Sequence, residues 1–177
     1  MKASDRLARA ALTVVLVAVT AAVLPHASQS RTENDEVAFP VGYRSWSHVK
    51  SALIGPESLI FARYGGLHHI YANDIAMEGY RTSEFPDGSV IVFGLLETRE
   101  SGGVTSEGPR RFIDVMVKDS KRYAETGGWG FEEFKGDSQT ERVLSAAAKT
   151  ACYKCHEQRK NHGFVFSSVR KSEQTHS

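Results

Sequence analysis

The sequence predicts a mainly β (α+β) domain, built as an antiparallel sheet or sandwich with a few short helices. Short runs rich in β-branched and aromatic residues alternate between apolar and polar positions, and turn pairs such as Gly65-Gly66 and Gly127-Gly128 separate them. The short connections favour antiparallel pairing, and about four or five strands fit the chain. Its 177 residues, 41% hydrophobic and 24% charged, have room for one globular domain.

The first half of the chain predicts a helix, a strand, a helix and a second strand. Apolar side chains in 40–53 recur every three or four positions, so we expect a short amphipathic helix there. Residues 67–72 alternate as a half-buried strand does, and 73–80 begins with a helix-capping asparagine. The turn Pro86-Asp87-Gly88 leads into a strand at 89–97 that is apolar on both faces.

The second half predicts three further strands and one helix. A Gly/Ser-rich loop is expected at 101–108. Ser138 and Glu141 have the spacing of a capping box, which predicts a helix over 143–155. The strands are expected at 111–118, 129–134 and 163–169.

Residues 1–30 have the composition of a secretory signal peptide. Three basic residues precede an apolar stretch at 10–24, and Pro25 ends it. This stretch is shorter than the roughly 20 residues that a membrane-spanning helix needs. We therefore expect export with cleavage, after Ala22 or after Ser30, in preference to a membrane anchor.

The remaining chain, residues 31–177, is expected to form a single domain in the periplasm. The whole chain has a formal net charge of +1, with 22 Lys and Arg against 21 Asp and Glu. Such a chain has no basic field that would attract a polyanion, so nucleic acid is not an expected partner. No contact with a membrane is expected beyond the signal peptide.

The run Cys-Tyr-Lys-Cys-His at 152–156 is the c-type heme attachment motif. Two thiols one helical turn apart, Cys152 and Cys155, can form thioethers to the vinyl groups of a porphyrin. His156 can then bind the iron as the proximal ligand. The sequence therefore predicts heme c, with its iron, as the cofactor.

Three other interpretations of the two cysteines remain open. A redox-active Cys-x-x-Cys pair would need a thioredoxin-like βαβ context. A zinc site would need two more ligands, for which His156 and His162 are available. A plain disulfide could form in an oxidising compartment. The export signal favours heme, because heme is attached to c-type proteins outside the cytoplasm.

The chain after the motif argues against a simple electron carrier. Small electron-carrier cytochromes follow the motif with an axial methionine. Only 21 residues follow His156, and none of them is methionine. Met77 and Met116 lie upstream, where we expect them as core residues. The strand-rich middle argues against the four-helix bundle of the cytochromes c′.

Several stretches together resemble the cytochrome P-460 family, which includes the cytochromes c′-beta. They follow the family order and cover nearly all of the chain after the leader. The resemblance implies a mostly antiparallel β fold with one heme c, five-coordinate iron and often a homodimer. The matching stretches are Phe39–Trp46, Gly66–Asn73, Phe85–Phe93, Met116–Tyr123, Gly127–Phe131 and the heme motif.

The resemblance also implies two kinds of heme pocket. Hydroxylamine-oxidising members have a lysine cross-linked to the porphyrin, in the strand after the Asp-Gly turn, and this position is Phe93 here. A phenyl ring cannot form the cross-link, whereas gas-binding c′-beta members have phenylalanine over the distal face. Phe93 is therefore expected in the distal pocket, with Phe61 as a second aromatic. A buried core residue is the alternative for Phe93.

Several polar side chains are further candidates for the pocket. His68 or His69, on opposite faces of the predicted strand, could donate to a ligand or bind the iron; the alternative is a hydrogen-bonded strand histidine. Glu132 falls near the position where hydroxylamine-oxidising relatives carry a possible catalytic base. Alternation sends either Glu132 or its neighbour Glu133 outward, so a solvated carboxylate is the alternative for Glu132. The pair Arg110-Arg111 could bind heme propionates; the alternative is ordinary surface charge.

The function predicted on this basis is the binding of small gases such as NO and CO by an exported mono-heme cytochrome, for capture, sensing or detoxification. Phenyl rings offer no hydrogen bond to an anion or to O2, so they favour neutral diatomics such as NO. The alternatives are an enzyme that oxidises hydroxylamine or NO, and a carrier that passes electrons to a periplasmic partner. Whether the protein is an enzyme is left open.

Overall fold

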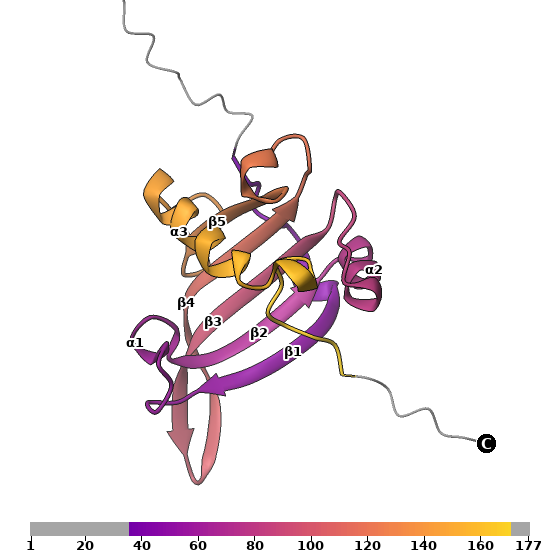
Figure 1. Cartoon of the computed structure of the whole chain (residues 1–177). Coiled ribbons are helices and arrows are strands. Elements are labelled where there is room, and N and C mark those ends of the chain that lie inside the picture. Colours follow the sequence, from indigo (N-terminus) through magenta and orange to yellow (C-terminus); the bar gives the residue numbers. More distant parts are fainter. Residues whose placement is uncertain (1–35, 171–177) are drawn as a thin grey trace, which may run out of the picture. The chain divides into compact units, whose positions relative to one another are not determined.

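The computed structural model describes residues 36–170, so the predicted signal peptide lies outside the described residues. The described part contains a single five-stranded antiparallel sheet in the order β1-β2-β3-β4-β5, together with short helices (Figure 1). Each strand pairs with the strand that follows it in sequence, which is the arrangement of a β-meander. The predicted fold class, mainly β and antiparallel, is confirmed.

The strands and helices have the following bounds. The strands are β1 (Ser47–Ile54), β2 (Gly66–Ala72), β3 (Val90–Ser101), β4 (Val104–Lys118) and β5 (Trp129–Lys135). The helices are α1 (Phe61–Tyr64), α2 (Asp74–Thr82) and α3 (Ala146–Glu157). Short 3-10 turns are η2 (Tyr43–Ser45), η3 (Ala124–Thr126) and η4 (Lys160–His162). The strands predicted at 67–72, 89–97, 111–118 and 129–134 and the helix predicted at 73–80 are confirmed.

The helix predicted over residues 40–53 is wrong, because the second half of this segment belongs to strand β1 and the first half holds only the 3-10 turn η2. Strand β1 pairs with β2 from Ser47 opposite Ala72 to Ile54 opposite Gly66. The register shifts between His48 and Lys50. Such a bulge adds one residue to the strand and breaks the two-residue alternation. The apolar positions are therefore spaced by three or four, as in a helix.

The loop predicted at 101–108 is wrong as well. β3 and β4 continue to the pair Ser101–Val104, and only Gly102 and Gly103 turn the chain. Both glycines have positive φ angles, 57° and 77°, which a two-residue type I′ hairpin turn requires. The far part of this hairpin, residues 97–110, extends beyond the sheet and is called the arm below (Figure 1).

The C-terminal elements also differ from the prediction. Ser138 Oγ accepts a hydrogen bond from the Glu141 amide at 2.9 Å, yet no helix starts there. Helix α3 begins later, where Ser145 Oγ accepts from the Ala148 amide at 3.2 Å. The strand predicted at 163–169 is wrong, since this segment has no regular structure and places Val165 in the core.

The sheet buries apolar side chains on both faces. On one face, residues of α2, α3 and the 163–166 segment pack against Ile91, Met116 and Trp129. On the other face, the chain before β1 packs Val37 and Tyr43 against the sheet. Successive residues of one strand therefore pack into different cores, one on each face of the sheet. Within residues 36–170, no helix has the length and apolar character to cross a membrane.

Asn73 ties α2 to the start of β3 and offers a test of the fold. Its Oδ1 accepts from the amides of Ala76 at 2.9 Å and Val90 at 3.0 Å, while its Nδ2 donates to Gly88 O at 2.9 Å. We expect Asn73→Ala to lower the free energy of unfolding by about 2 kcal/mol, measured by urea denaturation, since a helix cap is lost and the Val90 amide loses its partner.

Asn73→Asp is the matched control for this prediction. It keeps both acceptor bonds and loses only the donor to Gly88, so it should lose less stability than the alanine variant. An unchanged urea midpoint for Asn73→Ala would show that these hydrogen bonds do not hold α2 to the sheet.

Candidate functional site

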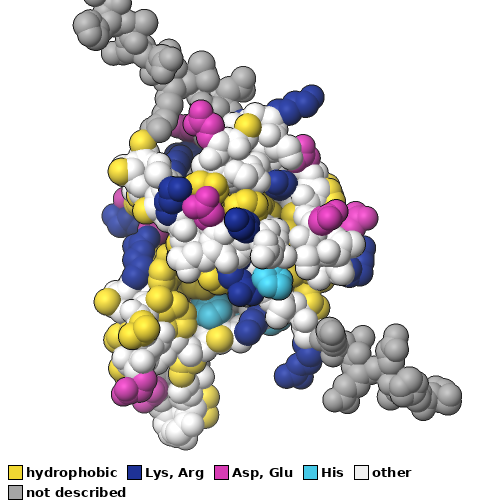
Figure 2. Space-filling view, in the orientation of Figure 1, with side chains coloured by type: hydrophobic (Ala, Val, Ile, Leu, Met, Phe, Trp, Pro, Cys, Tyr) yellow, Lys and Arg dark blue, Asp and Glu magenta, His cyan; other side chains and the backbone are white. Residues whose placement is uncertain are grey.

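Helix α3 lies over one face of the sheet and places both cysteines at a cavity of about 490 Å³ (Figure 1). Both are free thiols; Cys152 packs against the core beneath the helix, and Cys155 is exposed. In Figure 2, hydrophobic side chains gather over α1 and in the hollow between α1 and α3. The cavity is lined by Arg63, Tyr64, Glu133, Val143, Leu144, Ala148, Ala151, Cys152 and Cys155.

One row of cross-strand neighbours supplies the sheet side of this site. Ile70, Phe93, Asp114 and Glu133 are register partners on β2, β3, β4 and β5, so their side chains leave the sheet on the same face. The ring of Tyr64 lies 5.9 Å from the ring of Phe93, centroid to centroid. Because Tyr64 and Glu133 both line the cavity, this row connects Phe93 with the site.

The row also brings together two carboxylates and a cation. Arg63 forms an ion pair with Glu133, which is only 5% exposed. Desolvation and the neighbouring Glu133 raise the pKa of Asp114 well above its ordinary value. Asp114 therefore tends to hold a proton beside the ionised pair. Asp114 can thus hold one proton, so that Asp114 and Glu133 do not place two adjacent negative charges in the wall of the cavity.

His156 has the orientation that a metal-binding imidazole requires. Its Nδ1 lies 2.7 Å from the carbonyl oxygen of Phe164, and because a carbonyl only accepts, Nδ1 carries the proton. Nε2 then keeps a free lone pair, the form in which histidine binds iron. The ring lies 5.3 Å from Phe131 and 5.1 Å from Phe166, which restrict its rotation.

The turn that presents the Phe164 carbonyl is held in a strained conformation. Phe164 has a φ of 67°, which is uncommon for a residue with a bulky side chain. Trp129 Nε1 donates to the carbonyl of the preceding residue, Gly163, at 3.0 Å. A buried tryptophan of the sheet thus fixes the turn that orients His156.

His68 faces the same side of the sheet as Phe93. Its ring stacks on the ring of Phe93 at 4.7 Å, centroid to centroid. The side chain is 8% exposed and its Nδ1 has no hydrogen-bond partner among the described residues. Burial, with smaller effects from His69 and Lys50, lowers the pKa of His68 to about 4. His68 is therefore neutral near pH 7 and keeps an unsatisfied nitrogen on the cavity side of the sheet.

Three other predicted residues do not line this cavity. His69 points to the opposite face, where its Nδ1 lies 2.6 Å from Ser51 Oγ. Phe61 is 41% exposed on α1. Glu132 is buried away from the cavity in ion pairs with Lys149 at 2.7 Å and Arg142 at 3.4 Å, so the carboxylate at the cavity is that of Glu133.

The predicted arginine pair is bound to protein groups. Arg110 Nε donates to Asp137 at 2.7 Å. Arg111 donates to the carbonyl oxygens of Gly65 at 2.6 Å and Arg63 at 3.2 Å, which holds the loop before β2. Neither arginine lines the cavity. Binding of a propionate by either one stays a prediction.

Three residues of the site were not predicted from the sequence: Arg63, Tyr64 and Asp114. Asp114 had a usable signal, because it is a carboxylate between Phe112 and Met116 on the same face of a predicted alternating strand. A charged side chain on an apolar face is rarely there for packing. Arg63 and Tyr64 had no such signal, since α1 is a single helical turn whose position depends on the loops around it.

The structure also bears on the other interpretations of the cysteines. A reactive redox cysteine needs a lowered pKa, but burial and the nearby carboxylates of Asp114 and Glu133 raise the pKa of the Cys152 thiol to about 11. Among residues 36–170, no three His, Cys, Asp or Glu side chains are arranged to hold a metal ion. The zinc interpretation therefore has no ligand set in the described part of the chain.

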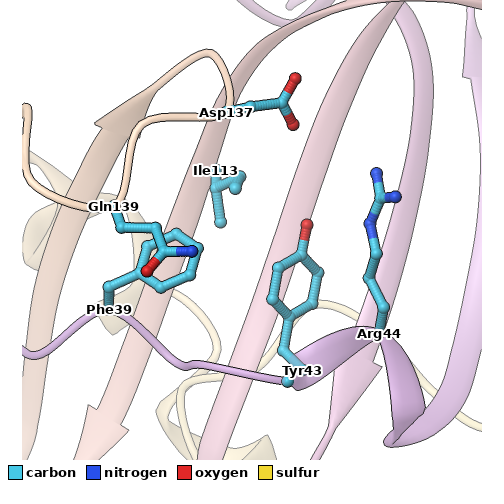
Figure 3. A pocket seen from close by; sticks show the side chains of 7 residues that line it. Phe39, Tyr43, Arg44, Ile113, Asp137 and Gln139 are labelled. Carbon is cyan, nitrogen blue, oxygen red and sulfur yellow. The ribbon is translucent and has the colours of Figure 1, made fainter.

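A second cavity, of about 280 Å³, lies on the opposite face of the sheet (Figure 3). Phe39 and Tyr43 stand over Ile113 of β4, and the charged groups of Arg44 and Asp137 lie at one end. No cysteine or histidine lines it. The cavity beside α3 is thus the one that fits the attachment motif.

The residues beside α3 fit a heme. Cys152 and Cys155 are reduced and share one cavity, His156 keeps Nε2 free, and His68 has an unpartnered nitrogen on the same face. Apolar side chains such as those of Phe93 and Phe112 exclude water from a bound iron and so influence its redox potential.

Comparison with known proteins agrees with this site. The family model described as Cytochrome P460 matches residues 40–167, a range that holds every residue of the site described above. The resemblance drawn from the sequence motifs is thereby confirmed. Comparison with curated proteins finds no match.

The raised pKa of Asp114 predicts how stability depends on pH. The fold holds this proton more tightly than the unfolded chain does, so its stabilising contribution is complete below the ordinary pKa of 3.8 and is lost as pH rises. Asp114→Asn cannot ionise and does not suffer this loss. The unfolding free energy of the variant, relative to the unmodified protein, should increase from pH 4 to pH 8 in urea titrations.

Asp137→Asn is the control, because this side chain is 79% exposed and pairs with Arg110 on the other side of the sheet. It should not gain relative stability with rising pH. A relative stability of Asp114→Asn that stays constant between pH 4 and pH 8 would contradict the raised pKa.

Proposed function

Because this chain belongs to the cytochrome P460 family and is therefore a heme-binding cytochrome, we propose that it is an exported mono-heme c-type cytochrome that binds a small neutral gas, above all NO, in the cavity beside α3. When bound, the heme supplies a redox-active iron with a coordination position for an external ligand. Cys152 and Cys155 hold the porphyrin as thioethers, and Nε2 of His156 is the proximal ligand.

Phe93 is the observation that carries this proposal. It lies on β3 in the row of register partners, between Ile70 and Asp114, at the position where the family resemblance implies a cross-linking lysine, and its side chain leaves the sheet on the same face as that of Glu133, which lines the cavity. Its ring packs with those of Tyr64, His68 and Phe112. A phenyl ring neither forms a cross-link nor donates a hydrogen bond, so this wall discriminates against anions and favours a neutral diatomic.

His68 lies beside Phe93 and adds a hydrogen-bonding group to the same pocket. Its imidazole is neutral near pH 7, because burial lowers its pKa to about 4, so one ring nitrogen carries a proton and the other does not. A neutral imidazole stacked on Phe93 can donate one hydrogen bond to a ligand without adding a charge. This contribution is compatible with binding of NO or CO.

A second function is favoured by Asp114 and Glu133. An ionised carboxylate can accept a proton from a substrate, which oxidation of hydroxylamine requires, and a neighbouring carboxyl group with a raised pKa can pass a proton on. In this alternative Glu133, ion-paired with Arg63, is the base, and Asp114 passes the proton on.

Homodimer formation, transfer of electrons to a periplasmic partner and the periplasmic location stay predictions of the sequence.

The gas-binding proposal predicts a ferrous absorption spectrum that is high-spin and shifts when CO or NO is added. Phe93→Ala should speed CO association about tenfold, equivalent to lowering the barrier by about 1.4 kcal/mol, because the ring that blocks entry is removed. Flash photolysis of the ferrous CO complex measures this rate. Phe61→Ala is the matched control and should leave the rate unchanged, since the Phe61 side chain is 41% exposed on α1 and does not belong to the row of Phe93 on the sheet.

Two outcomes would overturn this proposal. A low-spin ferrous spectrum that CO does not change would mean that a protein ligand closes the sixth position, and the electron-carrier alternative would replace gas binding. Equal CO association rates for Phe93→Ala and the unmodified protein would remove Phe93 from the ligand path.

The enzymatic alternative predicts turnover of hydroxylamine with an artificial electron acceptor. In that case Glu133→Gln should lower kcat about 100-fold, the usual contribution of a general base. Glu132→Gln should retain most of the activity, because its carboxylate binds Lys149 and Arg142 away from the cavity. A larger loss for Glu132→Gln in a folded, heme-loaded protein would assign the base to Glu132, and absence of turnover would exclude the enzyme.

A further inference from the structure

A chain of polar side chains lies on the face of the sheet opposite α3. Ser51 on β1 stands directly across from His69 on β2, and Ser51 Oγ lies 2.6 Å from His69 Nδ1. The other ring nitrogen, Nε2, lies 2.7 Å from Oε1 of Glu107, which belongs to the arm. His48 Nε2 approaches Ser51 Oγ from the other side at 2.8 Å. Neither the heme site nor the proposed gas binding uses these residues.

The chemistry of the partners fixes where the protons lie. Oε1 of Glu107 lies 2.7 Å from Nε2 of His69, and a carboxylate oxygen this close favours the tautomer that carries the ring proton on Nε2. The contact of Nε2 with Glu107 is a close ionic contact and not a hydrogen bond, because Nε2 has no hydrogen-bond partner among the described residues. Nδ1 of His69 is then an acceptor, and the hydroxyl of Ser51 donates to it. His48 Nε2–H in turn donates to Ser51 Oγ.

The fold holds this arrangement from three strands. The register pair between β1 and β2 fixes Ser51 against His69. On the next strand, Gly94 stands opposite His69, and a Cβ added there would lie 2.7 Å from Nη1 of Arg110. This glycine leaves room for the Arg110 side chain, which is 5% exposed and pairs with Asp137. The base of the arm is thereby anchored, and the arm carries Glu107.

We propose that Ser51 is a nucleophile activated by His69, with Glu107 as the positioning residue, and that it accepts acyl groups from small activated esters. A serine hydroxyl is a weak nucleophile unless an adjacent base takes its proton, and a base oriented by a third group is the arrangement that such sites use. The three residues meet both conditions, and Ser51 is exposed to solvent, where an ester can reach it.

Acyl transfer to Ser51 takes place in two steps. Ser51 Oγ forms a bond to the acyl carbon while its proton moves to Nδ1 of His69. The bond from the acyl carbon to the ester oxygen then breaks, and the leaving alcohol or phenol takes that proton. Glu107 stabilises the positive charge that His69 carries between these two transfers. The product is an acyl-serine at Ser51, and no oxidant, reductant or metal takes part.

The test is acetylation of the heme-loaded full-length chain by p-nitrophenyl acetate. Fragmentation mass spectrometry locates each acetyl group and separates Ser51 from the neighbouring Lys50. Ser101 is the internal control, because it is an exposed serine on a strand with no hydrogen bond to an imidazole. General-base assistance is worth about 100-fold or more, so Ser51 should be acetylated about 100 times faster than Ser101.

Two variants separate activation from simple exposure. His69→Gln can still accept a hydrogen bond from Ser51 but cannot take up its proton, so the rate at Ser51 should fall to that of Ser101. Glu107→Gln removes the charge while keeping an acceptor, and should give an intermediate rate with an unchanged far-UV circular dichroism spectrum. Equal rates at Ser51 and Ser101 in the unmodified protein, or a rate that His69→Gln leaves unchanged, would overturn the proposal.

Discussion

The two-residue period of the antiparallel strands is the constraint on which the rest of this structure depends. Because successive side chains leave the sheet on opposite faces, β2 presents His68 toward the cavity and His69 toward Ser51 and Glu107. The same period sends Glu133 to the cavity and Glu132 to Lys149. A shift of one residue in any strand would exchange these roles and would bring the wrong carboxylate to α3.

Helix α3 depends on the sheet for its place and its chemistry. The ion pairs of Glu132 with Lys149 and Arg142 fasten the β5 edge to the start of the helix and to the segment before it. Trp129 fixes the strained turn whose carbonyl orients His156. One short strand therefore supplies the helix anchor, the cavity carboxylate and the support of the imidazole, and this explains why nearly all of β5 is buried although it lies at the edge of the sheet.

Much of this arrangement can be predicted from the sequence, and the failures have physical causes. Alternation identified the strand from Arg111 to Lys118 correctly, and the Cys-x-x-Cys-His run lies at the cavity that we take as the candidate site. The bulge in β1 produced a helical spacing, and the hairpin at Gly102-Gly103 was read as a loop, because polar residues fill both strands of the arm. Alternation alone did not decide between Glu132 and Glu133, since both side chains are buried, one paired with Lys149 of α3 and the other with Arg63 of α1.

The net charge of the cavity wall links Phe93 to the choice between the two candidate functions. Phe93 stands directly opposite Asp114, so a lysine at this position would add a cation beside the two carboxylates. With phenylalanine there, Arg63 is the cation that pairs with Glu133, and Asp114 reaches neutrality by holding a proton, consistent with its raised pKa. One cation, one anion and one neutral acid leave no net charge in the wall. A wall without net charge does not attract an anion, so it favours the binding of a neutral gas. The proton on Asp114 stays available beside the cavity.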